Sequence, residues 1–152
     1  IDNRFVLGLG NPQSRIVIAK KLQSIGGELT SVVADSAIIG SYEVIIEKGV
    51  NLMHQVFISN CCRVGEGALV NTKAAVHHDV KIGNYSELSP GVIVLGGSEV
   101  GKFSSVGSGA IILPNLKIGS NAVIGAGSVI VKDVPDKAVV VGVPGRIIKF
   151  IK

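Results

Sequence analysis

The sequence predicts a mainly β protein, a solenoid in which short strands wind into stacked triangular coils. The first observation is an aliphatic residue at every sixth position, held for fifteen positions without a slip in phase. No helix has this period, an ordinary β-sandwich would show it only by accident, and a short sustained period is typical of solenoids. The positions are Ile46, Leu52, Ile58, Val64, Val70, Val76, Ile82, Leu88, Val94, Val100, Val106, Ile112, Ile118, Ile124 and Ile130.

The second observation is a mostly small residue four places after each aliphatic one. It lies two places before the next aliphatic residue, so on a strand both side chains face inward. Three hexads then make one triangular coil, and the stretch holds five coils. Each buried aliphatic side chain contributes ~1.5–3 kcal/mol before entropy is subtracted. The small residues are Cys62, Ala68, Ala74, Ser86, Ser98, Ser104, Ala110, Ala122 and Ser128.

The third observation is glycine directly after the aliphatic residue. We expect these positions to lead into corners with positive φ, which Gly adopts freely and Asn tolerates. They are Gly65, Gly83, Gly101, Gly107, Gly119 and Gly125, with Asn71 in the same slot.

Composition agrees with a narrow coil, because only 4% of the 152 residues are aromatic and none is Trp. The formal charge of +4, with basic residues mostly scattered, suits handling of anionic small molecules better than nucleic acid. No apolar run reaches the ~18 residues of a membrane span. Cys61 and Cys62 are adjacent and should point to opposite sides, so we expect reduced thiols in a cytoplasmic protein.

The segment before the hexads predicts a partial β-α-β unit. Residues 5–10 indicate a short buried strand, 13–25 carry helical apolar spacing that Gly26-Gly27 ends, and 28–33 indicate a second strand. Such units bind ligands at the carboxyl end of the strand. The Gly8-Leu9-Gly10 turn there is a weak phosphate-loop signal, and a plain tight turn explains it equally well.

Three regions follow from these patterns. Residues 1–36 form a partial, Rossmann-like substrate-binding piece, 37–135 form the β-helix, and 136–152 form a closing segment. Ile38-Ile39-Gly40 resembles a degenerate first hexad, with irregular register until Ile46.

Candidate chemistry lies in one polar hexad, where His77 and His78 should point outward and Asp79 follows. A carboxylate beside an outward imidazole fixes its tautomer and makes it more basic, which suits a general base. Two solvated surface histidines are the plain alternative. A zinc site built with His54 is a third, but His54 lies four hexads before His78, which is not a whole number of coils, so we expect no metal.

The coil length places further residues beside this hexad. Gly96 lies one coil after His78 and should expose backbone next to the imidazole. A separate corner series contains Pro90, Ser108 and Ala126. Backbone groups repeated at the coil spacing could line a groove for a long ligand.

Several motifs carry a family resemblance. The His-Asp hexad, Ile-Ile-Leu-Pro-Asn at 111–115, Ile-Gly-Ala-Gly-Ser-Val-Ile-Val-Lys-Asp-Val at 124–134 and the Val-Gly-Val-Pro-Gly-Arg ending resemble the left-handed β-helix acyltransferases with hexapeptide repeats. More closely, the chain is similar to the bacterial sugar O-/N-acetyltransferases, which include sialic acid O-acetyltransferases and acetyltransferases of UDP-linked 4-amino sugars. The resemblance covers nearly the whole chain. The family's opening strand and Gly-rich turn are missing before Ile1, so either the chain is a fragment or the substrate is held differently.

The resemblance also implies roles for particular residues. His78 matches the catalytic base and Asp79 its acid partner. Glu87 stands where relatives often have a second histidine near the thioester. Gly10 and Asn11 match a turn that helps to hold the nucleotide-sugar. Residues matching acetyl-CoA contacts are Gly96, Ser108, Ala126 and Arg146.

The activity implied by the resemblance is direct transfer of an acetyl group from acetyl-CoA, the cosubstrate, to an amino or hydroxyl group of a nucleotide-linked sugar. The ligand groove of this family lies between subunits, so a homotrimer is implied. O-acetylation of sialic acid or another free sugar, and a non-catalytic trimeric β-helix, are the alternative functions.

Overall fold

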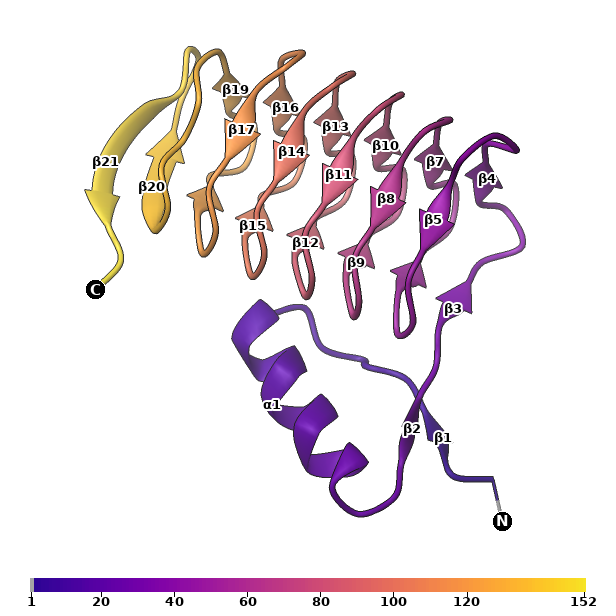
Figure 1. Ribbon diagram of the computed structural model, residues 1–152. Helices are drawn as coiled ribbons and strands as arrows, with labels where there is room; N and C mark the ends of the chain where they lie inside the picture. The colour runs from indigo at the N-terminus through magenta and orange to yellow at the C-terminus, as the bar shows by residue number, and fades with distance from the viewer. Residues whose placement is uncertain (1) are drawn as a thin grey trace.

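The computed structural model describes residues 2–152, and its main body is a row of stacked coils (Figure 1). Strands of successive coils pair in parallel and form three sheets. Partners in the regular part lie three hexads apart along the chain, as Ala75 with Ile93 and Lys81 with Glu99 do. The coil of three hexads is therefore confirmed, and the stack makes about six turns.

Each coil passes through the three sheets in the same order. The six-stranded sheet contains β4 (Ile38–Ile39), β7 (Phe57–Ile58), β10 (Ala75–Val76), β13 (Ile93–Val94), β16 (Ile111–Ile112) and β19 (Val129–Ile130). The five-stranded sheet contains β5 (Ile45–Ile46), β8 (Arg63–Val64), β11 (Lys81–Ile82), β14 (Glu99–Val100) and β17 (Lys117–Ile118). The eight-stranded sheet contains β3 (Val32–Val33), β6 (Asn51–Leu52), β9 (Leu69–Val70), β12 (Glu87–Leu88), β15 (Ser105–Val106), β18 (Val123–Ile124), β20 (Ala138–Val141) and β21 (Arg146–Phe150).

Three rows of corners join these sheets. The histidine corner follows the six-stranded sheet and holds His78, Gly96, Pro114 and Lys132. The aromatic corner follows the five-stranded sheet and holds Gly49, Gly67, Tyr85 and Phe103. The glycine corner follows the eight-stranded sheet and holds Gly91, Gly109 and Gly127, next to Pro90, Ser108 and Ala126.

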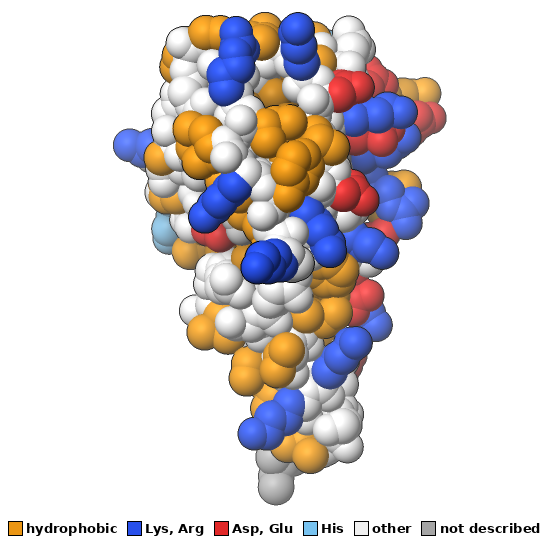
Figure 2. All heavy atoms as spheres, turned by 90° about the vertical axis from the view of Figure 1, so that its left-hand side faces the viewer, with side chains coloured by type: hydrophobic (Ala, Val, Ile, Leu, Met, Phe, Trp, Pro, Cys, Tyr) orange, Lys and Arg blue, Asp and Glu red, His pale blue; other side chains and the backbone are white. Residues whose placement is uncertain are grey.

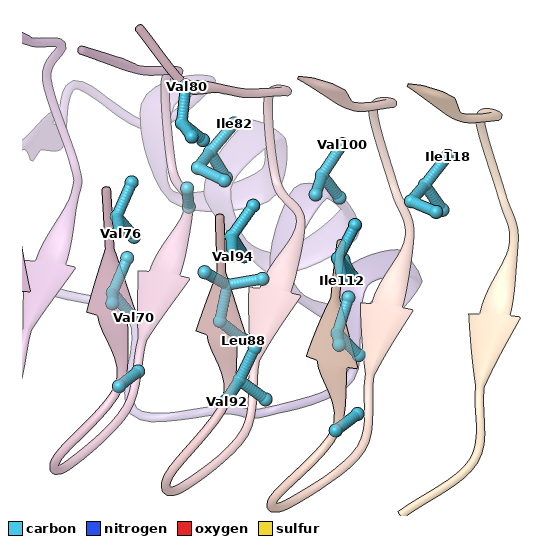
Figure 3. Packing of buried hydrophobic residues seen from close by; sticks show 14 of the residues in the cluster. Val70, Val76, Val80, Ile82, Leu88, Val92, Val94, Val100, Ile112 and Ile118 are labelled. Carbon is cyan, nitrogen blue, oxygen red and sulfur yellow. The ribbon is translucent and has the colours of Figure 1, made fainter. Parts of the chain in front are cut away.

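The interior is the aliphatic ladder that the sequence predicts. Fourteen of the fifteen positions are at most 2% exposed, and only Ile46 is partly buried. Figure 3 shows the side chains pointing into the coils, with Val76, Val94 and Ile112 coming from successive strands of the six-stranded sheet. The small residues are buried as well, so large and small side chains share the narrow space as expected.

Serine fits the small inner slot because its hydroxyl finds a partner on the next coil. Ser86 donates to the carbonyl of Gly101 at 2.7 Å, and Ser98 donates to that of Leu113 at 2.9 Å. Both serines are fully buried. These buried hydroxyls are therefore all hydrogen-bonded. A buried hydroxyl without a partner would destabilise the fold by about 1–3 kcal/mol.

The expectation of positive φ at the glycines directly after the aliphatic residues is wrong. Positive φ falls on the third residue after the aliphatic one, whatever its type, as at Tyr85 (φ 55°) and Gly67 (φ 65°). Glycine is required at these positions for another reason. A Cβ on Gly83, for example, would lie 2.5 Å from the backbone nitrogen of Lys102. Close approach of the next coil to the backbone thus requires Gly in this slot. The same holds against backbone at Gly65, Gly101, Gly107 and Gly119, and against the Val141 side chain at Gly125.

The N-terminal piece is a β-α-β unit, built from β1 (Arg4–Phe5), α1 (Pro12–Gln23) and β2 (Glu28–Leu29), with β1 and β2 parallel. The strand expected over 28–33 is divided, because β3 pairs with β6 and already belongs to the stack. Figure 1 shows α1 lying beside the coils. Leu7, Ala19 and Leu29 form a small apolar cluster with Tyr85 of the aromatic corner, which fixes this piece on the β-helix.

The stack is irregular at its start and closed by a hairpin at its end. Strands β3 and β4 pair with β6 and β7 one residue further along the chain than three hexads. The coils therefore begin before residue 37 and become regular only near Ile46, where β5 pairs with β8 at the ordinary spacing. At the other end β20 pairs in parallel with β18 and antiparallel with β21. Within residues 2–152, no helix combines the length and apolar character that a membrane crossing requires.

Candidate functional site

His78 and Asp79 occupy the turn after β10 at the histidine corner. The Nδ1 of His78 lies 2.8 Å from Oδ2 of Asp79, and because a carboxylate only accepts, Nδ1 carries the proton. Asp79 has φ 60°, and its N–H donates to the carbonyl of Asn60 at 3.1 Å in the preceding coil. Both side chains are about two-thirds exposed, at 67% and 63%. The carboxylate therefore fixes the tautomer of an imidazole whose Nε2 faces solvent.

Gly96 lies directly against this imidazole, as the coil spacing predicts. A Cβ on Gly96 would stand 2.5 Å from Cε1 and 2.6 Å from Nε2 of His78. The neighbouring N–H of Gly97 donates to the carbonyl of His78 at 3.0 Å, which locks the two turns together. Within residues 2–152, the N–H of Gly96 has no hydrogen-bond acceptor. The corner thus places an imidazole nitrogen beside a bare, available backbone donor.

His77 packs against a neighbouring aromatic ring, so its environment differs from that of His78. Its ring meets the edge of Phe57 on the preceding coil, with ring centroids 6.0 Å apart and planes at 71°. The side chain of His77 is only partly exposed, and within residues 2–152 it has no carboxylate partner. Of the two, His78 alone has the geometry of a base.

The cysteines at the same corner are not arranged as nucleophiles. Cys61 lies one coil before Asp79, and Cys62 is buried with its thiol donating to the carbonyl of His77 at 2.9 Å. Burial raises the pKa of both thiols, and the Asp79 carboxylate adds to the shift. Because the reactive form of cysteine is the thiolate, neither thiol is placed to act as a nucleophile.

Ser108 and Ala126 lie at the glycine corner, on the opposite edge of the six-stranded sheet from His78. Gly109 and Gly127 beside them have φ of 66°, and a Cβ on either would meet nothing within 4 Å. This corner is therefore a smooth, exposed ridge of backbone. One chain does not bring these expected acetyl-CoA contacts together with His78.

Arg146 begins β21 at the closed end of the stack, where it pairs with Val141 of β20. It lines a pocket of about 360 Å³ together with Lys132, Val131 and Ile147. Lys132 stands three coils after His78 along the same corner. Lys132 is not among the site residues expected from the sequence, although its distance of three coils from His78 would identify it. Figure 2 shows Lys and Arg side chains around apolar ones at this end.

Gly10 and Asn11 lie in the loop between β1 and α1, over the outer face of the eight-stranded sheet. Asn11 is the N-cap of α1, because its side-chain oxygen accepts from the N–H of Ser14 at 3.0 Å. A Cβ on Gly10 would lie 3.6 Å from a carboxylate oxygen of Glu87. Glu87 thus stands beside this loop and not beside His78 of the same chain.

A pocket of about 240 Å³ opens between this loop and the sheet. It is lined by Leu7, Gly8, Leu9 and Gly10 on the loop side and by Asn51, Met53, Leu69 and Asn71 on the sheet side. Met53 and Asn71 follow strands of the eight-stranded sheet and lead into the glycine corner. The loop pocket and the bare ridge are therefore neighbours on one side of the chain, and His78 is on the other.

A stack of coils built from hexads is the architecture of proteins with hexapeptide repeats. Residues 97–132 match the family described as bacterial transferase hexapeptide, six repeats. A GDP-perosamine N-acetyltransferase from Caulobacter crescentus is 32% identical with a TM-score of 0.93, and the match covers 97% of this chain and 70% of that one. The chain belongs to the left-handed β-helix sugar acetyltransferases.

Other solved structures agree. The acetyltransferase domain of PglB from Neisseria gonorrhoeae is 29% identical with a TM-score of 0.90, over 94% of this chain and 69% of that one. The Caulobacter structures contain CoA and GDP-perosamine. Two of them are variants with one histidine replaced, by Ala or by Asn, and both hold the two ligands.

Proposed function

We propose that the chain transfers an acetyl group from acetyl-CoA to the amino group of a nucleotide-linked sugar, with His78 as general base. The observation that carries the proposal is the exposed His78 imidazole, held at Nδ1 by Asp79 and lying against the bare backbone of Gly96. The similarity to a GDP-perosamine N-acetyltransferase supports nitrogen as the acceptor, and the similarity to the PglB acetyltransferase domain supports acetyl transfer.

The chemistry follows from this geometry. Nε2 of His78 takes a proton from the sugar amine as its nitrogen attacks the thioester carbonyl. The new C–N bond gives a tetrahedral intermediate whose oxyanion can accept from the Gly96 N–H. Collapse of the intermediate breaks the C–S bond and releases CoA, which recovers the proton from the imidazole. Asp79 stabilises the imidazolium formed between these steps.

Acetyl-CoA would run along the histidine corner. The thioester lies beside His78 and Gly96, and the phosphates lie near Lys132 and Arg146. Three coils separate the two ends, which is roughly 14 Å at about 4.8 Å per coil. An extended pantetheine arm can span this distance, and the two cations complement the phosphate charges at its end.

The remaining contacts require a second copy. Ser108, Ala126 and the loop of Gly10 and Asn11 lie on the side of the chain away from His78. In a homotrimer, the histidine corner of one subunit would face the glycine corner and loop pocket of the next. Each of three equivalent clefts then contains a base from one subunit and a sugar-binding loop from its neighbour. We place this reaction in the cytoplasm, whose reducing conditions keep thiols such as those of Cys61 and Cys62 free.

The test is acetyl transfer measured by mass. The protein is incubated with acetyl-CoA and GDP-perosamine, or with UDP-linked 4-amino sugars, and one acetyl group is expected on one of these sugars. GDP-mannose, whose sugar has hydroxyl groups but no amino group, is the matched control for oxygen as acceptor. Acetylation of GDP-mannose alone would contradict nitrogen transfer, and tight CoA binding without product on any sugar would favour a non-catalytic module.

A further inference from the structure

Arg15 is a fully buried cation in the middle of the N-terminal piece. It lies on α1 with 0% exposure, and its guanidinium donates to three main-chain carbonyls. Nε and Nη2 donate to Gly67 at 3.0 and 2.7 Å. Nη1 donates to Leu9 at 2.6 Å and to Leu7 at 3.3 Å. One side chain therefore joins the helix, the β1–α1 loop and the aromatic corner.

This arrangement is unusual for a buried charge, because no carboxylate within residues 2–152 forms an ion pair with the Arg15 guanidinium. Burial lowers the pKa of Arg15, and the field of Glu87 opposes that shift. Burying a guanidinium is costly unless its donors are used, and here carbonyl oxygens use them. An apolar side chain could fill the same space without the cost of burying a charge. The guanidinium of Arg15 is therefore needed for its hydrogen bonds to the carbonyls.

Two of the three carbonyls, those of Leu7 and Leu9, belong to the loop that borders the pocket of about 240 Å³. Leu7 and Leu9 flank Gly8, and Gly10 follows at once. Asn51 of β6 holds the same loop from the sheet side, because its Nδ2 donates to the carbonyl of Leu7 at 2.7 Å. The loop is thus held by α1 through Arg15 and by β6 through Asn51, while Gly8 and Gly10 remain exposed.

We propose that Arg15 is a positioning residue for the nucleotide-linked sugar, and that it acts by holding the loop of residues 7–11 in its binding geometry. This inference rests on the proposed function. Misplacement of a binding loop by about 1 Å can cost on the order of 100-fold in rate. The acetyl-CoA contacts lie elsewhere, at the histidine and glycine corners, so Arg15 should affect one substrate and spare the other.

Folding of α1 does not depend on this side chain alone. Ala19 and Leu29 pack with Tyr85, and Asn11 caps the helix independently. Lys in place of Arg keeps the charge and most of the length but loses the fork that reaches two segments at once. Arg15→Lys is therefore the variant of choice, and Asn51→Ala tests the same loop from β6.

The experiment compares Michaelis constants of the 152-residue chain and its variants. For Arg15→Lys we expect KM for the nucleotide-linked amino sugar to rise at least tenfold, with KM for acetyl-CoA within twofold of the wild type. Asn51→Ala should shift KM for the sugar in the same direction by a smaller factor. Arg63→Lys is the matched control, because Arg63 is exposed and bonds Glu47 on the surface, and it should leave both constants unchanged. Methylguanidinium should restore sugar affinity to Arg15→Ala.

The outcomes separate the inference from the proposed function. Equal rises in both Michaelis constants, or an unchanged KM for the sugar in both loop variants, would overturn the role of Arg15. So would Arg15 variants that unfold and that methylguanidinium does not rescue, because they assign the residue to folding. A wild-type chain that acetylates none of the amino sugars would sink the proposed function itself.

Discussion

The histidine corner and the glycine corner border the same six-stranded sheet and repeat with the same coil spacing, yet they carry opposite surfaces. At the first, His78 and Asp79 form a polar pair against Gly96. At the second, Gly109 and Gly127 leave open backbone with nothing within 4 Å of a Cβ. The coil fixes where each position lies, and the two corners differ in the second and third residues after the aliphatic one. A single chain holds these two surfaces apart, on opposite edges of the six-stranded sheet.

The largest expected effect is loss of the base at the histidine corner. In His78→Asn the side chain keeps a similar shape but can no longer take a proton. We expect kcat to fall about 10²–10⁴-fold, which is the usual contribution of a general base. KM for acetyl-CoA should change less than threefold, because the cofactor contacts remain. Steady-state kinetics checks this, and near-normal turnover would remove His78 from the mechanism.

The second prediction tests whether the two corners meet between subunits. His78→Asn removes the base, and Ala126→Trp should block the ridge of the glycine corner; each variant alone is expected to be nearly inactive. When the two are co-expressed, every mixed trimer should have one cleft of its three that combines an intact His78 with an intact ridge.

Activity near a third of wild type is therefore expected from mixed trimers, which separate affinity tags on the two variants select. A double variant with both changes in one chain, mixed with wild type, supplies the control for subunit exchange. Mixed trimers that stay inactive would place both corners in the same subunit's cleft, and an Ala126→Trp variant that is active on its own would exclude the glycine corner from the site.

The period predicts the ladder, the coil length and the position of Gly96, because each depends only on spacing along a strand. A local rule of positive φ does not explain the glycines after the aliphatic residues. Their cause is the close approach of the next coil to positions such as Gly83, and that approach depends on the stacked structure. Lys132 was overlooked although its spacing from His78 reveals it. The surroundings of Glu87 and the clamp of Arg15 depend on how the N-terminal piece docks, which no periodicity records.

The third prediction concerns the bare backbone of the two corners. In Gly96→Ala the new methyl group would meet the His78 ring at 2.5 Å, so the imidazole must move. We expect kcat to fall about tenfold with little change in stability, because a small misplacement of a catalytic group is costly. Gly109→Asn is the comparison, since Asn tolerates positive φ and finds open space there.

Gly109→Asn should retain kcat and raise only KM for acetyl-CoA, by a few-fold. Kinetics with each substrate varied in turn distinguishes the two variants. A fall in kcat of the same size at both corners would show that glycine serves the coil geometry and not the site.

The smallest effect belongs to the aromatic corner, which the N-terminal piece covers. Burial raises the pKa of Tyr85 to about 12 from its ordinary 10, and Glu66 adds to the shift. The folded chain therefore holds a proton that the unfolded chain releases above pH 10. This contribution to stability is complete below pH 10 and is lost as pH rises towards 12. Tyr85→Phe should cost about 1 kcal/mol at pH 8, through the lost hydrogen bond to Glu66.

That cost should shrink between pH 10 and 12, because Phe has no proton to lose. Urea unfolding at fixed protein concentration and at pH 8, 10 and 11.5 measures the difference. Tyr42→Phe is the matched control, since Tyr42 is 60% exposed and should leave the stability unchanged at every pH. A difference that stays constant for Tyr85→Phe would mean that water reaches its hydroxyl. The N-terminal piece would then cover the aromatic corner too loosely to hold a sugar-binding loop in place.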